Sequence, residues 1–338
     1  MSAMAQTTPS IRGWQSVAPG LTGIAFREDL CLSRPGRGEL LVAVGAAGVN
    51  FSDILMLQDR YQVRPDRPFV PGQEVAGRVV EAGPGTAFKA GDLVAGEVET
   101  GGFSEYALLR DTAAVPIPNA YAMTDAAALP VAYGTAIVAL TESTGLEAGE
   151  TVLVHAAAGG VGLAAVQVAK ALGATVIATA STEAKQALAL ETGADHAVDY
   201  GREAWAEEVR ALTGGRGVDV VVDTVGGMVT RASLGCLARG GRLLVIGFAS
   251  GEIPQIPANR LLLKRASAIG VHWKQDLDRD LWKRAKARMA ELVDAGAIRP
   301  VVEARHGLRD LPLALADLAE RRSRGKLVLT VGAEESGS

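Results

Sequence analysis

The sequence predicts an α/β protein in which a doubly wound parallel sheet is joined to a second, mostly-β domain. Between positions 39 and 110, short apolar runs are broken by Gly and Pro, a pattern typical of antiparallel strands with tight turns. From Ala126 onward, Ala-rich helical segments alternate with runs of β-branched residues, a pattern typical of parallel βαβ units. The chain has 338 residues, 48% of them hydrophobic, so two domains with sizeable cores are expected.

Six β-branched runs predict the strands of the parallel sheet, at 151–155, 174–179, 196–199, 218–223, 242–246 and 266–271. Between them lie segments whose apolar residues recur every three or four positions, which predicts helices at 161–172, 183–192, 204–212 and 230–238. Crossovers of this length bring successive strands parallel, so the runs predict one doubly wound sheet. The remaining sequence predicts a charged helix at 279–295, an extended stretch at 298–304, a helix at 308–320 and a strand at 326–331.

Composition and charge exclude several classes of protein. The chain has 34 Lys and Arg against 38 Asp and Glu, so we expect neither a nucleic acid nor a membrane as partner. The first ten residues lack the features of a secretory signal. The apolar stretch 152–169 is long enough to span a bilayer, but His155 and a Gly-Gly pair interrupt it, which favours a strand, a turn and a helix. The only cysteines, Cys31 and Cys236, do not suit a disulfide framework and indicate a cytoplasmic location.

The segment VLVHAAAGGVGLAAVQVAKALGATVIATAST, at 152–182, combines a strand, a small-residue turn, a helix and a second strand. Within it, Ala157-x-Gly159-x-x-Gly162 fits the GxGxxG pattern with Ala at the first position. The first small residue permits the tight turn, Gly159 lets the backbone approach a pyrophosphate, and Gly162 allows close packing of helix on strand. A tight turn without a ligand is the alternative. We interpret the motif as a dinucleotide site whose phosphates meet the helix N-terminus, with the predicted binding residues Ala157, Gly159, Gly160, Val161 and Gly162.

The end of the second strand predicts which nicotinamide cofactor binds. NAD-binding folds place an acidic residue there, about 20 residues after the glycines, to bind the ribose 2′-hydroxyl. This chain has Ser181 and Thr182 instead, and its first acid, Glu183, already belongs to the predicted helix. The two hydroxyls and the ammonium of Lys185 suit a 2′-phosphate, so NADPH is favoured.

Six segments together carry a resemblance to a known family. They are GVNFSD at 48–53, YQVRPDRPFVPGQEVAG at 61–77, HAAAGGVG at 155–162, GADHAVDY at 193–200, GFASG at 247–251 and NRLLLK at 259–264. They resemble the zinc-independent quinone oxidoreductase (zeta-crystallin-like) branch of the medium-chain dehydrogenase/reductase superfamily. The resemblance implies a Rossmann domain at 128–272 that binds NADPH. It also implies a GroES-like catalytic domain formed by 1–127 and 273–338.

The same resemblance implies the absence of a catalytic metal. In the zinc-dependent relatives a Cys, a His and a second Cys hold the ion, whereas Asn50, Gln73 and Val131 stand at the aligned positions. No cluster of cysteines occupies the segment that holds a structural zinc in those relatives. Zinc catalysis is therefore not expected.

Further cofactor contacts are implied by the resemblance. Lys185 and Tyr200 fall where the family contacts the 2′-phosphate, with Ser181 just before them, and Arg321 is the candidate for a C-terminal arginine at the same phosphate. Thr135 matches a threonine near the nicotinamide. The loop that lines the cofactor after a late strand contributes Gly247, Phe248 and Ser250.

Metal-free hydride transfer requires a hydrogen-bond donor, because negative charge grows on the carbonyl oxygen of the acceptor. Tyr61 is the predicted catalytic donor and Asn50 its helper, since both match family positions on the nicotinamide side. The alternatives are structural: Tyr61 as a packing residue, and Asn50 as a residue that stabilises its own turn.

The resemblance thus implies an NADPH-dependent reductase of quinones or related conjugated carbonyls. Two alternatives remain open, a reductase of 2-enoyl thioesters and a non-catalytic NADPH-binding structural protein, while Asn50, Gln73 and Val131 oppose a zinc alcohol dehydrogenase. Family analogy also predicts a homodimer, with 242–246 and 266–271 as the paired edges.

Overall fold

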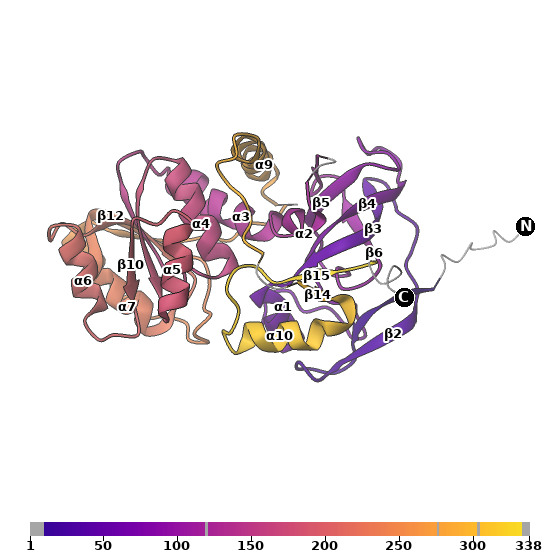
Figure 1. Cartoon of the computed structure of the whole chain (residues 1–338), viewed down its shortest axis with the longest axis horizontal. Helices are drawn as coiled ribbons and strands as arrows, with labels where there is room; N and C mark the ends of the chain where they lie inside the picture. The colour runs from indigo at the N-terminus through magenta and orange to yellow at the C-terminus, as the bar shows by residue number, and fades with distance from the viewer. Residues whose placement is uncertain (1–9, 119–120, 276, 303–304, 333–338) are drawn as a thin grey trace, which may run out of the picture. The chain divides into compact units, whose positions relative to one another are not determined.

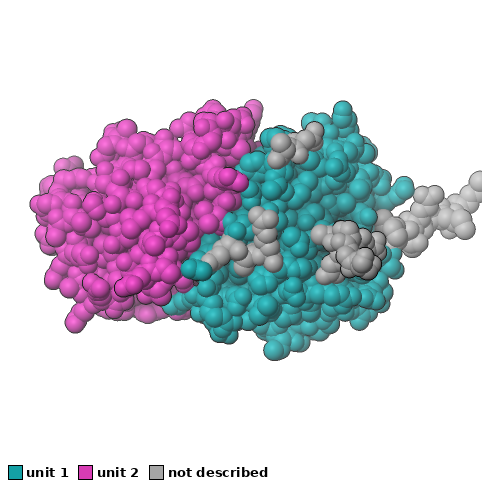
Figure 2. All heavy atoms as spheres, viewed as in Figure 1, with its two compact units in different colours: residues 1–131, 302–338 teal, residues 132–301 magenta. Residues whose placement is uncertain are grey.

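The computed structural model describes residues 10–118, 121–275, 277–302 and 305–332. The chain divides into two compact units, which Figure 2 shows in different colours. Unit 1 consists of residues 1–131 and 302–338, and unit 2 consists of residues 132–301. Each unit has its own sheet and its own hydrophobic core.

Unit 2 is built on a six-stranded sheet with the order β10-β9-β8-β11-β12-β13, in which every strand pair is parallel. In chain order this is 3-2-1-4-5-6, the order of a doubly wound dinucleotide-binding sheet. The predicted fold class is therefore confirmed. The strands are β8 (Thr151–Val154), β9 (Thr175–Ala180), β10 (His196–Asp199), β11 (Val218–Asp223), β12 (Leu237–Val245) and β13 (Ser267–Gly270).

Helices cover both faces of this sheet. In Figure 1, α4 (Gly160–Ala171) and α5 (Glu183–Glu191) lie on one side, and α6 (Trp205–Leu212) and α7 (Gly227–Cys236) lie on the other. A shorter helix, α8 (Ala258–Lys264), precedes the edge strand β13. Buried aliphatic residues of the strands pack against these helices, because both faces of a parallel sheet must be covered.

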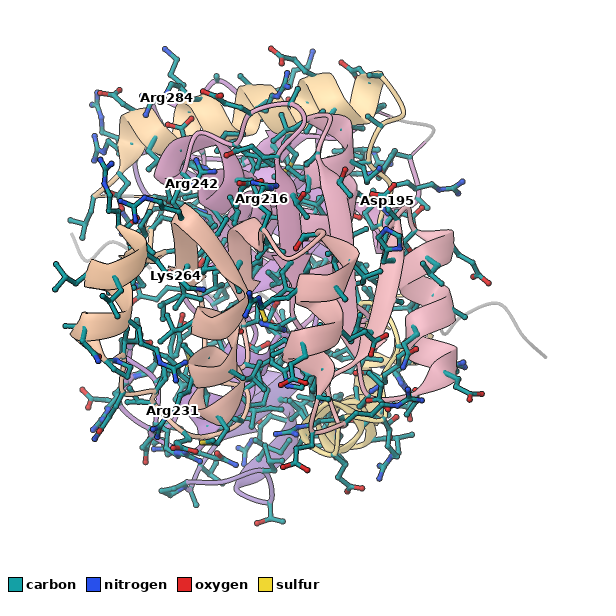
Figure 3. The ribbon with its side chains drawn as sticks, turned by 90° about the vertical axis from the view of Figure 1, so that its left-hand side faces the viewer. Asp195, Arg216, Arg231, Arg242, Lys264 and Arg284 are labelled. Carbon is teal, nitrogen blue, oxygen red and sulfur yellow. The ribbon has the colours of Figure 1, made fainter. Side chains whose placement is uncertain are left out.

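The ion pairs of Arg216 and Arg242 lie at the amino ends of β11 and β8. Arg216 pairs with Asp219 of β11 at 2.5 Å, and Arg242 of β12 pairs with Glu150, which directly precedes β8. In Figure 3, Arg216 and Arg242 lie at one end of the sheet, whereas Arg231 of α7 lies at the opposite end. The turn from β8 into α4 belongs to that opposite, carboxyl end.

Unit 2 also contains most of α3 (Pro130–Ile137), the π-helical segment Val138–Ser143 and α9 (Arg279–Asp294). The predicted domain limits assign 273–301 to the catalytic domain, whereas this structure groups those residues with unit 2. The physical reason is apolar burial: Trp282 of α9 is 2% exposed and stacks on Trp273, which follows β13.

Unit 1 is mostly β, as predicted. Its seven-stranded sheet has the order β14-β15-β3-β4-β5-β7, and β6 pairs with β3. The strands are β3 (Glu39–Gly48), β4 (Glu74–Ala82), β5 (Leu93–Glu97), β6 (Tyr106–Arg110), β7 (Val115–Pro116), β14 (Arg305–Gly307) and β15 (Val328–Thr330). A separate antiparallel pair consists of β1 (Ile11–Ser16) and β2 (Ile24–Leu30).

The C-terminal part of the chain completes this unit. Strand β15 pairs antiparallel with β3, with Leu329 opposite Ala47. The helices are α1 (Phe51–Leu57), α2 (Met123–Ala126), the 3-10 turn Leu308–Asp310 and α10 (Leu311–Ala319). Of the stretch predicted to be extended at 298–304, residues 298–302 form no regular strand, and residues 303–304 lie outside the described part of the chain.

The apolar stretch 152–169 forms β8, a turn and most of α4, as the sequence predicts. Among the residues that the structure describes, no helix is both long and apolar enough to cross a bilayer.

Candidate cofactor and active site

The turn between β8 and α4 is tightly packed. Ala156 has a left-handed backbone with φ 48°, and the N–H of Ala157 donates to the Thr179 carbonyl oxygen at 3.0 Å, which ties the turn to β9. A Cβ on Gly162 would lie 2.3 Å from the Ala156 carbonyl oxygen. Only glycine therefore allows α4 to begin this close to the strand, which is the role predicted for Gly162.

Gly159 has a different environment. A Cβ at this position would approach only the Ala156 carbonyl oxygen, at 3.4 Å, so the surrounding protein does not itself demand glycine. Gly159 is the N-cap of α4, and the following amides of Gly160, Val161 and Gly162 have no acceptor within the helix, because a helix leaves its first N–H groups unpaired. These amides and the helix dipole form a site suited to a pyrophosphate.

The residues predicted to bind the 2′-phosphate in unit 2 follow the carboxyl ends of the neighbouring strands β9 and β10. Asp199 of β10 pairs with Ala180 of β9, so the next residues of the two strands, Tyr200 and Ser181, follow neighbouring strand ends. Lys185 lies in the first turn of α5, where its amide donates to the Thr182 hydroxyl at 3.3 Å. We refer to Ser181, Lys185 and Tyr200 as the phosphate cluster.

The loop after β12 contains Gly247, Phe248 and Ser250 and rests on the turn after β11. The Ala249 amide donates to the Thr224 carbonyl oxygen at 3.1 Å, and the Ser250 amide donates to the Val225 carbonyl oxygen at 2.8 Å. This loop therefore lies at the same carboxyl edge as the GxGxxG-like turn. The fully buried carboxylate of Asp223 organises the underlying turn, accepting from the Val225 amide at 2.9 Å and the Gly226 amide at 3.0 Å.

A buried histidine beneath the turn is a feature that sequence reasoning did not assign. His155 contacts the Thr179 hydroxyl through Nδ1 at 2.8 Å and the Ser233 hydroxyl through Nε2 at 2.7 Å. Because Ser233 donates its hydrogen to the Val229 carbonyl oxygen at 2.7 Å, Nε2 must carry the proton and Nδ1 must accept from Thr179. Burial lowers the pKa of His155 to about 4, so the ring is neutral at neutral pH. A lone His inside a β-branched run was the sequence signal for such a network.

The remaining predicted cofactor residues lie on other elements. Thr135 is a partly buried residue of α3 in unit 2. Arg321 belongs to unit 1, where it is exposed in the turn after α10 with φ 58°. Its contact with the 2′-phosphate stays a prediction.

Unit 1 contains a buried polar cluster formed by Asn50, Glu74 and Lys326. Glu74 is fully buried and Lys326 is 6% exposed, and their charged groups lie 2.7 Å apart. The Lys326 ammonium also donates to Asn50 Oδ1, while Asn50 Nδ2 donates to Glu74 Oε2 at 3.1 Å. The other Glu74 oxygen accepts from the Val131 amide at 2.7 Å. Both ends of the Asn50 side chain are therefore engaged within this cluster.

Asp53 lies beside the cluster, in the first turn of α1. Its Oδ2 accepts from the Asn50 backbone amide at 2.8 Å, and its Oδ1 is buried without a partner among the described residues. Burial raises the pKa of Asp53 to about 7, and the charge of Glu74 acts in the same direction, against the opposing effects of the Asn50 amide and Lys326.

Tyr61 follows α1 and packs partly buried against the core of unit 1. Burial is the main reason why the pKa of its hydroxyl is raised, and the charges of Glu97 and Asp53 add to the effect. Tyr61 therefore keeps its proton at neutral pH, as a hydrogen-bond donor must.

Comparisons with known proteins agree with this geometry. Residues 36–119 match the alcohol dehydrogenase GroES-like domain, and residues 160–291 match the zinc-binding dehydrogenase family. A quinone oxidoreductase-like protein 2 homolog from Nematostella vectensis is 41% identical over 300 residues, which cover 87% of this chain and 82% of the relative. The chain belongs to the quinone oxidoreductase-like branch of the medium-chain dehydrogenase/reductase superfamily.

Solved structures of this superfamily extend the agreement over nearly the whole chain. A mycobacterial protein complexed with NADPH is 34% identical with a TM-score of 0.88, covering 95% of this chain and 100% of that one. A quinone oxidoreductase from Pseudomonas syringae is 30% identical with a TM-score of 0.86, covering 95% and 99%. The chain is thus an NAD(P)-dependent reductase of the quinone oxidoreductase-like type.

The family description includes zinc, but the residues at the aligned ligand positions do not fit this ion. Asn50 and Gln73 offer amides rather than thiolate or imidazole, and Val131 has no donor atom in its side chain. The structure brings Asn50 and Val131 together on the carboxylate of Glu74, where Lys326 supplies the positive charge. Among the described residues, no group of three or more His, Cys, Asp or Glu side chains is placed to hold a metal.

Proposed function

We propose that this protein reduces quinones or related conjugated carbonyls by hydride transfer from NADPH, without a catalytic metal. The proposal is supported most strongly by two features that occur together in unit 2, the turn after β8 and the end of β9. A GxGxxG-like turn at the centre of a 3-2-1-4-5-6 sheet offers free helix amides, and the second strand ends in hydroxyls and a lysine rather than an acid.

When bound, NADPH supplies the hydride. The first-turn amides of α4 would hold the pyrophosphate, and the loop at Gly247, Phe248 and Ser250 would line the cofactor together with Thr135. The phosphate cluster discriminates for the 2′-phosphate, because an ammonium and hydroxyl groups donate to its oxygens whereas an acid would repel them. The NADPH complex of the mycobacterial relative supports this assignment by analogy.

Tyr61 is proposed as the donor to the carbonyl oxygen of the acceptor. As hydride arrives, charge grows on that oxygen, and a hydroxyl with a raised pKa remains protonated and able to donate. Tyr61→Phe removes the donor and is expected to lower kcat about 100-fold, the usual contribution of one such group. Tyr106→Phe, at another partly buried tyrosine of unit 1, is the matched control and should leave kcat near the wild-type value. Equal rates for the two variants would remove Tyr61 from the mechanism.

For Asn50 the hydrogen bonds support a narrower role than the sequence suggests. Its amide is used within the buried cluster, so we propose that it fixes the start of α1 and the position of Glu74 rather than donating to the acceptor.

Reduction of 2-enoyl thioesters is the second candidate, because the same hydride chemistry serves an enone and an enoyl thioester. The deciding experiment compares NADPH oxidation with 1,4-benzoquinone, with 9,10-phenanthrenequinone and with a 2-enoyl-CoA, and tests alcohol oxidation with NADP⁺. Turnover of the quinones supports the proposal. Turnover of the thioester alone replaces it with the second candidate, and tight NADPH binding without turnover of any acceptor indicates a binding protein.

We also propose a homodimer, paired through the β13 edge of unit 2. The predicted edge at 242–246 is wrong, because β12 pairs with β11 on one side and with β13 on the other. Three of the four residues of β13 are exposed, α8 has no buried residue, and Leu262 and Leu263 are 76% and 73% exposed. An open strand edge beside two exposed leucines is a surface that a second copy would cover. Light scattering should therefore give the dimer mass for wild type and for the control Leu313→Glu on α10. The double variant Leu262→Glu, Leu263→Glu should be monomeric, and a dimeric double variant would contradict the proposed interface.

A reducing, cytoplasmic compartment is part of the proposal. Both cysteines are free: Cys31 is exposed and Cys236 is buried, and burial raises the pKa of the Cys236 thiol to about 12. A buried thiol of this kind is protonated and unreactive, which suits an intracellular chain.

A further inference from the structure

Two tryptophans of unit 2 form a stacked pair to which the proposed function gives no role. Trp273 follows β13, and Trp282 lies on α9. Their ring centroids are 4.5 Å apart and their planes are inclined by 14°. Trp282 is 2% exposed, whereas Trp273 is only partly buried. The pair therefore has one ring sealed in the core and one ring with accessible surface.

Gly134 of α3 fixes the position of this pair. A Cβ at Gly134 would lie 2.9 Å from Cζ3 of Trp282 and 3.3 Å from Cζ2 of Trp273. Both rings thus pack directly against the backbone of α3, and the next residue of that helix is Thr135. A ring supported on one side by a second indole and at its edge by a helix backbone is a rigid, flat apolar surface.

The sheet determines where this surface lies. Because all six strands are parallel, their carboxyl ends share one edge, and ligands of doubly wound sheets bind there. Trp273 is the third residue after the end of β13, and the Val271 amide still donates to the Val245 carbonyl oxygen of β12 at 2.9 Å. The phosphate cluster follows β9 and β10, in the other half of the sheet. Trp273 therefore belongs to the half in which the nicotinamide end of a dinucleotide binds.

We propose that Trp273 is a specificity-determining residue that stacks on flat, fused-ring acceptors. It would favour polycyclic quinones over small quinones and over flexible enoyl thioesters, because stacking increases with the planar area that meets the indole. This inference rests on the proposed function, since it requires that an acceptor be reduced at this edge of the sheet.

The test compares two quinones that differ in planar area. Trp273→Leu keeps an apolar side chain and removes the aromatic face, and it is expected to lower kcat/KM for 9,10-phenanthrenequinone about three- to tenfold, the range of one aromatic stacking interaction. The value for 1,4-benzoquinone should change less than about twofold, and the KM for NADPH should not change. Trp273→Phe should restore most of the loss. Trp14→Phe in unit 1 is the matched control for loss of an indole.

The outcomes separate this inference from the function on which it rests. A selective loss for the larger quinone, with circular dichroism like that of wild type, supports the role of Trp273. Equal losses for both quinones, or no loss, overturn it while quinone reduction itself stands. If Trp273→Leu does not fold, Trp273→Phe decides, with a smaller loss in the same direction expected. Failure of the wild-type protein to reduce either quinone contradicts the proposed function, and the inference falls with it.

Discussion

At the scale of single residues, the buried cluster of Asn50, Glu74 and Lys326 is where electrostatics matters most. A carboxylate and an ammonium with almost no exposed surface are stable only as a pair with further hydrogen bonds, and each group here has such bonds. The cluster also joins α1, β4 and the segment before β15, so its charge balance is linked to the folding of unit 1.

Lys326→Met leaves the Glu74 carboxylate buried without its cation. We expect a loss of about 3–5 kcal/mol in the free energy of unfolding, measured by urea denaturation. The double variant Lys326→Met, Glu74→Gln removes both charges and should recover a large part of that loss. A single variant within about 0.5 kcal/mol of wild type would show that the pair does not support unit 1.

Asp53 predicts a specific pH dependence. Its pKa is raised from 3.8 to about 7, so between these values the folded protein holds a proton that the unfolded chain has released. Stability contributed by this residue is therefore present below about pH 4 and decreases as the pH rises to about 7, by a few kcal/mol at most. Asp53→Asn removes the titration. The stability of the variant relative to wild type should therefore rise between about pH 4 and pH 7 and stay constant above that, and a difference that does not vary with pH would contradict the assignment.

At this scale, sequence reasoning could name side chains but not their partners. Asn50 and Lys326 are 276 positions apart, and only the pairing of β15 with β3 brings them together. The sequence therefore indicated Asn50 as a possible donor to substrate, whereas its hydrogen bonds show an amide engaged within the protein. Tyr61 and the phosphate cluster were proposed from motifs, and their roles stay predictions until activity is measured.

At the scale of elements, the junction of β8 and α4 is the feature on which the proposed cofactor site depends. Gly162→Ala would place a Cβ 2.3 Å from the Ala156 carbonyl oxygen, which forces the helix away from the strand. We expect the free energy of unfolding, measured by denaturation, to fall by about 1–3 kcal/mol. We also expect a large loss of NADPH affinity, measured by fluorescence titration.

The control for this prediction is Gly235→Ala on α7. A Cβ there meets no atom within 4 Å, so alanine should be neutral or should stabilise the helix by up to about 1 kcal/mol. Similar behaviour of the two variants would show that close packing at Gly162 is not the reason for its glycine.

Element types were largely predictable and element limits were less so. The six strands follow from β-branched runs, but β12 begins at Leu237 rather than at the predicted position 242, because Leu237 already pairs with Val218 across an irregular register. Helix α7 begins at Gly227 rather than at the predicted position 230. The Asp223 carboxylate accepts from the Val225 and Gly226 amides, and these hydrogen bonds stabilise a helix start at Gly226 and Gly227. The start of this helix depends on a side chain several residues before it, so the spacing of apolar residues in the sequence does not indicate it.

At the scale of the whole molecule, the chain forms two units, each with its own sheet and hydrophobic core. Unit 2 has the doubly wound sheet and the GxGxxG-like turn, and unit 1 has Tyr61 and the buried cluster of Asn50, Glu74 and Lys326. The overall architecture was predictable because local patterns and family motifs agree along most of the chain. The grouping of α9 with unit 2 was not, since it depends on the packing of Trp282 against Gly134 of α3, which is far away in sequence.

The most direct test of the central claim is steady-state NADPH oxidation with 9,10-phenanthrenequinone, followed by loss of NADPH absorbance, on protein whose zinc content is measured in the same sample. NADH is the parallel cofactor. The account predicts turnover that does not depend on zinc, with kcat/KM for NADPH at least about tenfold above that for NADH, the effect of one charge-assisted interaction with the 2′-phosphate. Activity that appears only with stoichiometric zinc, or an equal preference for NADH, would contradict it.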